Sequence, residues 1–432
     1  MAEQHEKALV PQIRFTGFTD PWEQRKLGEV ARRVTRKNEN GDSDLPLTIS
    51  AQYGLVDQRT FFNSQVASKD MSGYFLLHRG EFAYNKSTST DSPWGAIKRL
   101  EKYDMGCVST LYICFELLSG DPDFLVTYYE TDRWYKSVQL IAAEGARNHG
   151  LLNIAPDDFF ETQICIPKRI DEQRRIGAFF DRLDSLITLH QRKYDKLCVL
   201  KKSMLDKMFP KGGSLYPEIR FAGFTDPWEQ RKLGEVASGF EYGLNAAASD
   251  FDGEKKYLRI TDIDDQTREF RTDDLSSPDI NNPIDDRYLL KEGDILFART
   301  GASVGKTYLY KASDGKTYYA GFLIRAHVSD EADAGFIFQS TLTERYKQFV
   351  LLTSQRSGQP GINAQEYSDL LLPLPSLMEQ RRIGAFFDRL DSLITLHQRK
   401  YCGVASWMLG VALVRLGSES DGAFGEMKHV LR

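Results

Sequence analysis

The sequence has few cysteines and no pair of them at metal-binding spacing. Its five cysteines stand apart with no Cys-x-x-Cys pair, so we expect neither a structural zinc site nor a disulfide framework. Long hydrophobic runs are missing too: the most apolar stretch, Val404–Val414, has 11 residues and is too short to span a bilayer. The polar N-terminal dozen residues have no apolar core of a secretory signal. These absences predict a cytoplasmic protein without membrane contact.

The sequence also has no excess of one charge. The net charge is -5 and the pI is near 5.9, so the chain is not a polycation that attracts nucleic acid through its overall field. Its contents of 41% hydrophobic and 27% charged residues are ordinary for a globular protein and exclude a wholly disordered chain. A length of 432 residues corresponds to roughly three units.

Signatures of catalysis are missing as well. The chain has no HExxH motif, no glycine-rich dinucleotide fingerprint and no Asn-Pro-Pro-aromatic motif of an adenine methyltransferase. Gly301–Thr307 resembles a phosphate-binding loop, but three residues separate its glycines where that loop needs four. We therefore expect a non-catalytic chain, and an NTPase is disfavoured.

What the sequence does contain is a long internal repeat. Residues 11–31 and 217–237 match at 19 of 21 positions, and residues 172–194 and 379–401 match at all 23. The offsets of 206 and 207 residues indicate two half-chains in tandem, each with a variable block between constant blocks. Packing alone does not require such identity. We favour recombination that keeps the constant blocks alike over a recent duplication, because the variable blocks have diverged almost beyond alignment.

The repeat predicts four domains along the chain. A first globular domain with its constant segment covers residues 1–171, and a central helix covers 172–211. The second domain with its repeated constant segment covers 212–378, and a C-terminal helix with an atypical tail covers 379–432. Each variable block has around 140 residues, which is enough to bury its own core.

Each second constant block has the pattern of a long helix. Glu172–Phe209 carries apolar residues at heptad spacing and would be about 57 Å long, ending at Pro210. We expect the two copies to pair antiparallel through a helix or subunit interface. The interface candidates are Ile176, Phe179, Leu183, Leu186, Ile383, Phe386, Leu390 and Leu393. After Tyr401 the second copy departs from the first, and Gly403 and Gly410 weaken its helix.

The variable blocks mix short strand-like runs with turns and helical patches. The segments that indicate this are Cys107–Leu117, Asp294–Arg299 and Lys306–Tyr310 for strands and Ala334–Leu352 for a helix. The predicted fold class is α/β, with two globular domains separated by two long antiparallel coiled-coil helices and related by an internal pseudo-two-fold repeat.

The two halves share a pattern that suits DNA contact. Gly80–Ser87 aligns with Gly293–Thr300: a turn, an apolar strand, then a loop that opens with a cation and a hydroxyl. Such side chains read phosphates and base edges, and an amide such as Asn153 or Asn363 can pair with adenine. The DNA-binding candidates are Tyr84, Asn85, Lys86, Ser87, Thr88, Ser89, Asn153, Arg299, Thr300, Gly301, Ser303, Lys306 and Asn363. The alternatives are an ordinary surface hairpin and an asparagine that caps a turn.

Local charge tempers the DNA interpretation. Residues 32–170 have a net charge of -2 and residues 238–377 a net charge of -7, whereas residues 172–211 carry +5. The variable blocks therefore do not attract DNA strongly by themselves.

The architecture resembles the specificity subunit of a type I restriction–modification enzyme. The resemblance rests on the repeated WEQRKLGEV at Trp22–Val30 and Trp228–Val236, on the two EQRRIGAFF helices, on Gly80–Thr88 and on the Pro-Leu-Pro run at Pro373–Pro375. It implies two target recognition domains, each of which reads half of a split, asymmetric site in double-stranded DNA.

The resemblance also implies partners. Two methyltransferase subunits would bind S-adenosylmethionine and methylate adenine N6, and restriction and translocase subunits would use ATP and Mg. This chain would then hold no cofactor and no metal of its own. A rival interpretation from the residues is a coiled-coil scaffold with two protein-binding domains, which would explain the helices but not the matched cation-hydroxyl loops.

Overall fold

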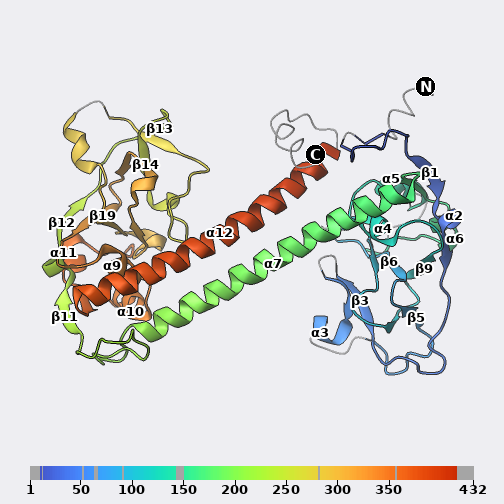
Figure 1. Ribbon diagram of the computed structural model, residues 1–432, viewed down its shortest axis with the longest axis horizontal. Coiled ribbons are helices and arrows are strands. Elements are labelled where there is room, and N and C mark those ends of the chain that lie inside the picture. Colours follow the sequence, from blue (N-terminus) through green and yellow to red (C-terminus); the bar gives the residue numbers. More distant parts are fainter. Residues whose placement is uncertain are drawn as a thin grey trace. The chain divides into compact units, whose positions relative to one another are not determined.

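Two compact units make up the chain in the computed structural model. The structure describes residues 10–415 except 12, 51–52, 63–66, 90–91, 143–149, 281–282 and 356–357, and only the backbone of 401–415. One unit is formed by residues 1–188 and 403–432, the other by residues 189–402. Each contains a mixed α/β half, and a long helix follows each half along the chain (Figure 1). Among the described residues Cys107, Cys114, Cys165 and Cys198 are free thiols.

The first α/β half and the helix after it contain short strands and mostly short helices. In chain order these are β1 (Glu23–Lys26), α2 (Leu27–Val30), β2 (Ala31–Arg33), β3 (Leu47–Ser50), β4 (Gly54–Asp57), α3 (Gln58–Phe62), β5 (Phe75–His78), β6 (Phe82–Asn85), β7 (Ala96–Arg99), β8 (Met105–Val108), β9 (Ile113–Leu117), α4 (Pro122–Tyr129), α5 (Tyr135–Ala142), α6 (Pro156–Phe160), β10 (Gln163–Ile166) and α7 (Ile170–Met208).

The second half repeats much of this order. Its strands are β11 (Glu229–Lys232), β12 (Ala237–Tyr242), β13 (Ala248–Asp250), β14 (Lys256–Leu258), β15 (Ser276–Pro278), β16 (Asp294–Ala298), β17 (Thr307–Leu309), β18 (Thr317–Tyr319), β19 (Leu323–Val328) and β20 (Leu371–Leu374). Its helices are α8 (Leu233–Val236), α9 (Ala334–Ser340), α10 (Glu344–Thr353), α11 (Ala364–Ser368) and α12 (Leu377–Arg415), with 3₁₀ turns η1 (Ile260–Asp262), η2 (Pro283–Tyr288), η3 (Gly301–Ser303) and η4 (Ala312–Asp314).

Both halves are built on the same four-stranded antiparallel sheet. The strand order is β2-β9-β6-β7 in the first half and β12-β19-β16-β17 in the second. The central strands are buried and apolar, as their sequences predict. The variable blocks therefore keep a common fold although their sequences have diverged.

Two predicted segments are divided in the structure. Cys107–Leu117 contributes to both β8 and β9, because a turn closed by the Tyr112 N–H and the Ser109 carbonyl separates them. Ala334–Leu352 is divided between α9 and α10, because α9 ends at Ser340 with Thr341 as its C-cap and the Thr343 hydroxyl caps the start of α10. In both cases the apolar pattern is continuous and only local hydrogen bonding marks the break.

The first constant segment of each half closes onto the strand that precedes the long helix. β1 pairs antiparallel with β10, and β11 pairs in the same way with β20. The backbone N–H of Leu27 then donates to the Thr162 carbonyl, and that of Leu233 donates to the Leu370 carbonyl. The repeated WEQRKLGEV sequence is thus the clasp that joins the beginning and the end of each variable block.

A buried ion pair completes each clasp. The Arg14 guanidinium donates two hydrogen bonds, of 2.6 and 2.8 Å, to the Glu172 carboxylate at the start of α7. Arg220 makes the same pair with Glu379 at 2.8 and 2.7 Å. The two glutamate side chains are only 1% and 0% exposed, so the guanidinium supplies the compensation that a buried charge needs.

The residue after each glutamate reaches the variable block through backbone groups. The Gln173 side chain accepts from the Asp121 N–H and donates to the Pro167 carbonyl. The Gln380 side chain makes the equivalent bonds to the Asp333 N–H and the Pro375 carbonyl. The start of each long helix is therefore positioned by main-chain atoms, which every sequence provides.

A helix of the variable block docks at this point in both halves. Asp121 caps α4 by accepting from the Phe124 N–H at 2.9 Å, and Asp333 caps α9 by accepting from the Phe336 N–H at 2.8 Å. A Cβ atom at Gly177 of α7 would lie 2.7 Å from Phe124 N. The repeated glycine of the EQRRIGAFF sequence thus allows the close approach of two helices.

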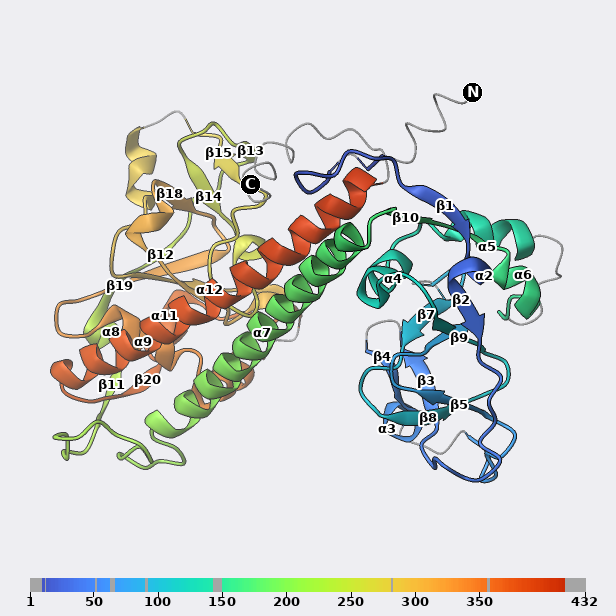
Figure 2. The same ribbon diagram turned by 45° about the vertical axis from the view of Figure 1, so that its right-hand side comes forward.

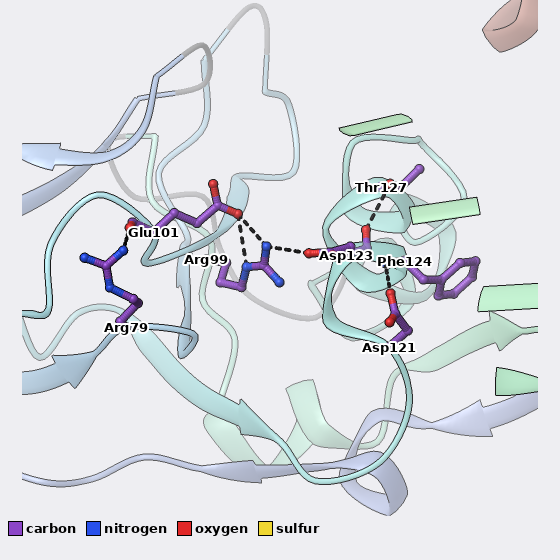
Figure 3. Close-up of polar contacts among 7 residues, drawn as sticks. All are labelled: Arg79, Arg99, Glu101, Asp121, Asp123, Phe124 and Thr127. Atoms are coloured by element: carbon purple, nitrogen blue, oxygen red, sulfur yellow. Dashed lines mark hydrogen bonds and ion pairs between the residues drawn. The ribbon is translucent and has the colours of Figure 1, made fainter. Parts of the chain in front are cut away.

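Figure 3 shows how α4 is tied to the sheet. The Arg99 guanidinium on β7 lies between two carboxylates and contacts Glu101 and Asp123 at 2.7 Å each. Thr127 donates to the Asp123 carbonyl within the helix, while the Arg79 side chain donates to the Glu101 carbonyl. These contacts orient the capped end of α4 toward the edge strand of the sheet.

The long helices confirm the predicted helical blocks. α7 begins two residues before the predicted start and ends one residue before the predicted end, and α12 continues through Gly403 and Gly410 to Arg415. In the second unit the C-terminal part of α7 lies beside α12 (Figures 1 and 2). The pairing is antiparallel, since His190 contacts His397 whereas the later Lys201 pairs with the earlier Asp391.

The residues that form the seam of α12 differ in part from the predicted ones. Ile383 and Leu390 are buried as predicted, but the alternate positions are taken by Phe387 and Ile394. Phe386 instead packs edge-on against Phe221 of the constant segment, at 6.1 Å between ring centroids, and Leu393 is 41% exposed.

In α7, too, two of the predicted seam residues lie elsewhere. Phe179 packs against Phe15 of the first constant segment at 5.7 Å, and Leu186 is 39% exposed. Ile176 packs against the core of the first half, and Leu183 is half-buried. Both series have heptad spacing, so the choice between them is made by the aromatic ring of the constant segment that each phenylalanine meets.

The two histidines occupy equivalent repeat positions and touch each other. The Nδ1 atoms of His190 and His397 lie 3.0 Å apart. Because contact between equivalent residues requires a local two-fold relation, this pair marks the pseudo-two-fold axis of the helix pair. Burial, together with the charges of His190, Lys193 and Lys400, lowers the pKa of His397.

We predict a large stability loss when the buried ion pair of the second unit is broken. Arg220→Met leaves the Glu379 carboxylate buried without its partner and should lower the free energy of unfolding by about 3–5 kcal/mol. Chemical denaturation of the full chain measures this. Lys232→Met is the matched control, because Lys232 and Asp369 form a half-exposed pair that solvent screens, so its loss should lower the stability only slightly. Equal effects of the two substitutions would contradict the role given to Arg220.

We also predict that acid weakens the helix pair through its histidines. The folded-state pKa of His397 lies below its ordinary value, so the unfolded chain binds more protons as the pH falls below about 6.5. The stability that the neutral His397 contributes is therefore fully present above that pH, and it is lost as the pH falls through the folded-state pKa. Unfolding measured at pH 7.5 and 5.5 should show a smaller acid loss in His397→Gln than in the unsubstituted chain. His78→Gln, on an exposed position of β5, should change nothing.

Candidate nucleic-acid interface

The two matched loops follow equivalent strands. β6 and β16 each begin after a glycine with positive φ, Gly80 at 92° and Gly293 at 89°, where a side chain would be strained. Each strand is the third of its four-stranded sheet. The loops that begin at Lys86 and Arg299 therefore leave corresponding ends of corresponding sheets.

A second segment runs beside each loop and brings the candidate asparagines to it. The Lys86 carbonyl accepts from the Leu152 N–H, and the Arg299 carbonyl accepts from the Ile362 N–H at 2.9 Å. Asn153 and Asn363 are the next residues, and both are exposed. Two patterns that the sequence shows far apart are thus adjacent in both halves.

Tyr84 is a correction to the predicted site. Its side chain is fully buried, its hydroxyl donates to the Trp94 carbonyl at 2.7 Å, and its ring stacks on Phe159 at 4.8 Å. Phe297 and Tyr367 form the equivalent pair in the second half. Tyr84 therefore stabilises the base of the loop and is not available to DNA, since its position on the strand directs it into the core.

The remaining candidates of the first loop lie at or near the surface. Asn85 accepts from the Ser87 N–H, and the Thr88 hydroxyl donates to the Gly150 carbonyl. Ser87 and Ser89 are exposed. The ammonium of Lys86 donates to the Ile154 carbonyl at 3.2 Å, and burial lowers the pKa of this lysine. The loop is thus a turn with exposed hydroxyls and one half-buried cation at its base.

Arg299 is held between aromatic rings in the second loop. Its guanidinium lies 5.0 Å from the ring centroid of Tyr242 and 5.8 Å from that of Phe322. The buried Nε has no hydrogen-bond partner among the described residues. Tyr242 and Phe322 are themselves 43% and 59% exposed, so the group presents flat apolar surface together with a cation.

Lys306 is a second correction. It is 8% exposed, and its ammonium donates to the Ile263 carbonyl at 3.2 Å and pairs with Asp265 at 2.5 Å. These contacts turn the lysine away from the glycine loop, unlike the lysine of a phosphate-binding loop. Thr300 donates to the Pro360 carbonyl, and Gly301 and Ser303 form the half-buried 3₁₀ turn η3.

The asparagines differ between the halves. Asn363 caps α11: its side chain accepts from the Glu366 N–H at 2.9 Å, and the Glu366 carboxylate accepts from the Asn363 N–H. The capping alternative therefore holds for Asn363, and only its amide nitrogen remains open to a base. In the first half Ala155 occupies the cap position of α6, so Asn153 is not the N-cap of that helix.

A hollow of about 620 Å³ adjoins Arg299. Arg259, Tyr242 and Phe322 line it together with the strands β12 and β14. The sequence did not single out these three residues, because they come from segments 20 to 60 residues away from Arg299. Exposed aromatic rings beside arginine suit the stacking of bases and the binding of phosphates. In the described part of the chain no three or more His, Cys, Asp or Glu residues form a metal-binding group, and no helix is long and apolar enough to cross a membrane.

Comparisons with known proteins agree with this arrangement. The family of the type I restriction modification DNA specificity domain matches residues 225–404. The type I restriction enzyme MjaVIII specificity subunit of Methanocaldococcus jannaschii is 24% identical over 306 residues, which cover 68% of this chain and 70% of that protein. The structure of the type I restriction-modification system S subunit from M. genitalium has a TM-score of 0.57 at 14% identity and covers 95% of this chain and 100% of that one.

The second half is thus a DNA specificity domain, and the first half has the same core sheet and the same clasp. Residues 225–404 belong to that family, and the chain is similar over 68% of its length to a specificity subunit of a type I restriction–modification system. It is the DNA specificity subunit of such a system and not one of its catalytic subunits, and its family carries no cofactor.

Proposed function

We propose that each half of the chain reads one half of a split, asymmetric DNA target. The observation that carries this proposal is the equivalence of the two loops: Lys86 and Arg299 follow the same strand of the same sheet and lie beside Asn153 and Asn363. Exposed hydroxyls complete the first loop, and exposed aromatic rings complete the second. Because these side chains differ between the halves, the two half-sites should differ in sequence.

We further propose that the long helices dock two methyltransferase subunits, which bind S-adenosylmethionine, and that restriction subunits supply ATP and Mg. Support comes from leucines on the helices that stay partly exposed among the described residues. At equivalent repeat positions, Leu186 and Leu393 are 39% and 41% exposed, and Leu189 and Leu396 are 46% and 45% exposed. Paired exposed leucines on helices are typical of a surface that binds another protein. Two such surfaces, related by the repeat, fit two copies of one partner.

The domain boundaries that fit this proposal are 1–171, 172–211, 212–378 and 379–432. The long helices then form the connection, and the residues on either side form the readers. Cations supplied by the docked subunits would compensate for the net charge of -7 on residues 238–377.

We predict that Lys86→Ala and Arg299→Ala each weaken recognition of one half-site and leave the other half-site unchanged. A contact to a base edge should cost about 1–3 kcal/mol and relax one position of the target, because the wrong base no longer leaves a partner unpaired. The measurement is a map of methylated adenines made by the complex with its methyltransferase subunits.

Matched controls for these substitutions are Arg79→Ala and Arg271→Ala. Each removes an exposed arginine of the same half that pairs with a nearby aspartate and lies off the loops. If all four variants give the methylation map of the unsubstituted complex, the loops are structural, and the result favours the coiled-coil scaffold with two protein-binding domains.

We predict that helix length determines the unread gap between the half-sites. Insertion of one heptad after His190 and one after His397 keeps the antiparallel seam in register and lengthens each helix by about 10.5 Å. The gap should grow by about 3 base pairs at ~3.4 Å each, with both half-sites unchanged. A heptad in α7 alone shifts Lys201 away from Asp391 and should impair the protein. An unchanged gap with the matched insertion would show that the helices do not set the spacing.

A further inference from the structure

The second unit has another groove that residues of the Arg299 loop also line. It has a volume of about 930 Å³, and it is bordered by Gly301, Ala302 and Gly305 of that loop, by α7 and α10, and by residues 265–269. None of the predicted DNA contacts except Gly301 lies in it. The loop that follows β16 therefore contributes to two hollows, one lined by Arg299 and one lined by Arg268.

Two of the cations that line this groove stand outside its ion pairs. Five carboxylates line it, and each is already in an ion pair: Asp206 with Lys211, Asp265 with Lys306, Glu269 with Lys311, Glu344 with Lys347, and Asp391 with Lys201. Of the four cations that line it, Lys201 and Lys347 belong to these pairs. Arg268 and Lys202 have no ion-pair partner among the described residues. The groove thus has two cations outside its ion pairs, although the charges of Asp265 and Asp264 also act on Arg268.

Arg268 is also placed at an unusual backbone position. It is the one non-glycine residue with positive φ in the described part of the chain, at 61°. It closes a tight turn in which the Asp264 carboxylate accepts from the Gln266 and Thr267 N–H groups, and its own N–H donates to the Asp264 carbonyl. Glycine or asparagine would fit this turn with less strain.

Burial acts against the charge of Arg268. Its surroundings in the groove lower the pKa of its guanidinium, with desolvation as the main cause. A strained backbone and a half-buried, unpaired cation are both unfavourable for the folded chain alone. Such a combination is retained where the side chain serves a ligand.

We propose that Arg268, in the groove that Lys202 also lines, binds a phosphate of the DNA backbone next to the half-site that the second unit reads. This inference rests on the proposed function and adds a contact outside the bases. A phosphate fits because it accepts the planar guanidinium fork and needs no carboxylate in return. DNA is the source that the structure favours, since the groove is bordered by the same loop that carries Arg299.

The test uses the full chain in complex with its methyltransferase subunits and a duplex that contains the target. Arg268→Gly relieves the positive φ, so thermal stability should stay equal or rise. DNA affinity should nevertheless fall about fivefold at 0.15 M salt, and the slope of log affinity against log salt should fall by about one, as for the loss of one phosphate contact. The methylated sequence should not change.

Two further variants make the result specific. Arg268→Lys keeps the charge and should restore most of the salt slope. Arg271→Ala removes an equal charge outside the groove, where Arg271 pairs with Asp273, and should leave affinity unchanged. Unchanged affinity and slope in Arg268→Gly would overturn the proposal. A relaxed base preference would assign Arg268 to a base, and loss of the methyltransferase subunits would assign it to a protein partner, so both results also overturn it.

The same experiment separates this inference from the function on which it rests. If the unsubstituted complex binds its target with sequence preference and Arg268→Gly binds equally well, only the phosphate site fails. If the unsubstituted complex shows no sequence preference, the proposed reading of DNA by the two halves fails.

Discussion

The structure of each half depends on one buried ion pair, between an arginine of the first constant segment and the glutamate that opens the long helix. Arg14 with Glu172 and Arg220 with Glu379 join residues about 160 positions apart, and everything between them is the variable block. Next to each pair a constant glutamine contacts main-chain atoms of the variable block, as Gln173 does with the Asp121 N–H and the Pro167 carbonyl. Contacts to main-chain atoms do not depend on which side chains the variable block carries. This explains in physical terms how two diverged blocks fit near-identical constant segments.

Much of this frame could be predicted from the sequence, because the signals are local or repeated. The repeat itself, the long helices and the strands of the matched loops are all marked by residues close together in the chain. The side of the helix that forms the seam could be predicted only in part. Phe386 and Phe387 both fit a heptad pattern, and Phe221 of a distant segment decides which of them turns away from the seam.

In the candidate site, local sequence patterns do not predict which side chains are buried. Tyr84 and Lys306 belong to the same short patterns as Lys86 and Arg299, yet the core takes the first two. Nothing in a loop sequence states which side chain finds a carbonyl such as that of Trp94 or Ile263 behind it. The residues that reasoning from the sequence missed, Tyr242, Phe322 and Arg268, reach the loop through sheet register and turn geometry. Of these three residues only Arg268 has a local signal, because it closes a turn in which glycine would fit with less strain.

The balance of charge gives these few side chains their importance. Residues 238–377 carry a net charge of -7, so the second half as a whole repels DNA. Around the loop, however, three carboxylates form ion pairs with lysines, namely Asp265, Glu269 and Glu344. Arg299 and Arg268 form no ion pair within the described chain. A domain that repels DNA overall, and has only a few arginines free to contact it, binds DNA poorly at any sequence where those arginines find no phosphate or base to contact. For a subunit whose task is to choose one sequence among many, weak non-specific binding favours selection, because competing sites then hold the complex less.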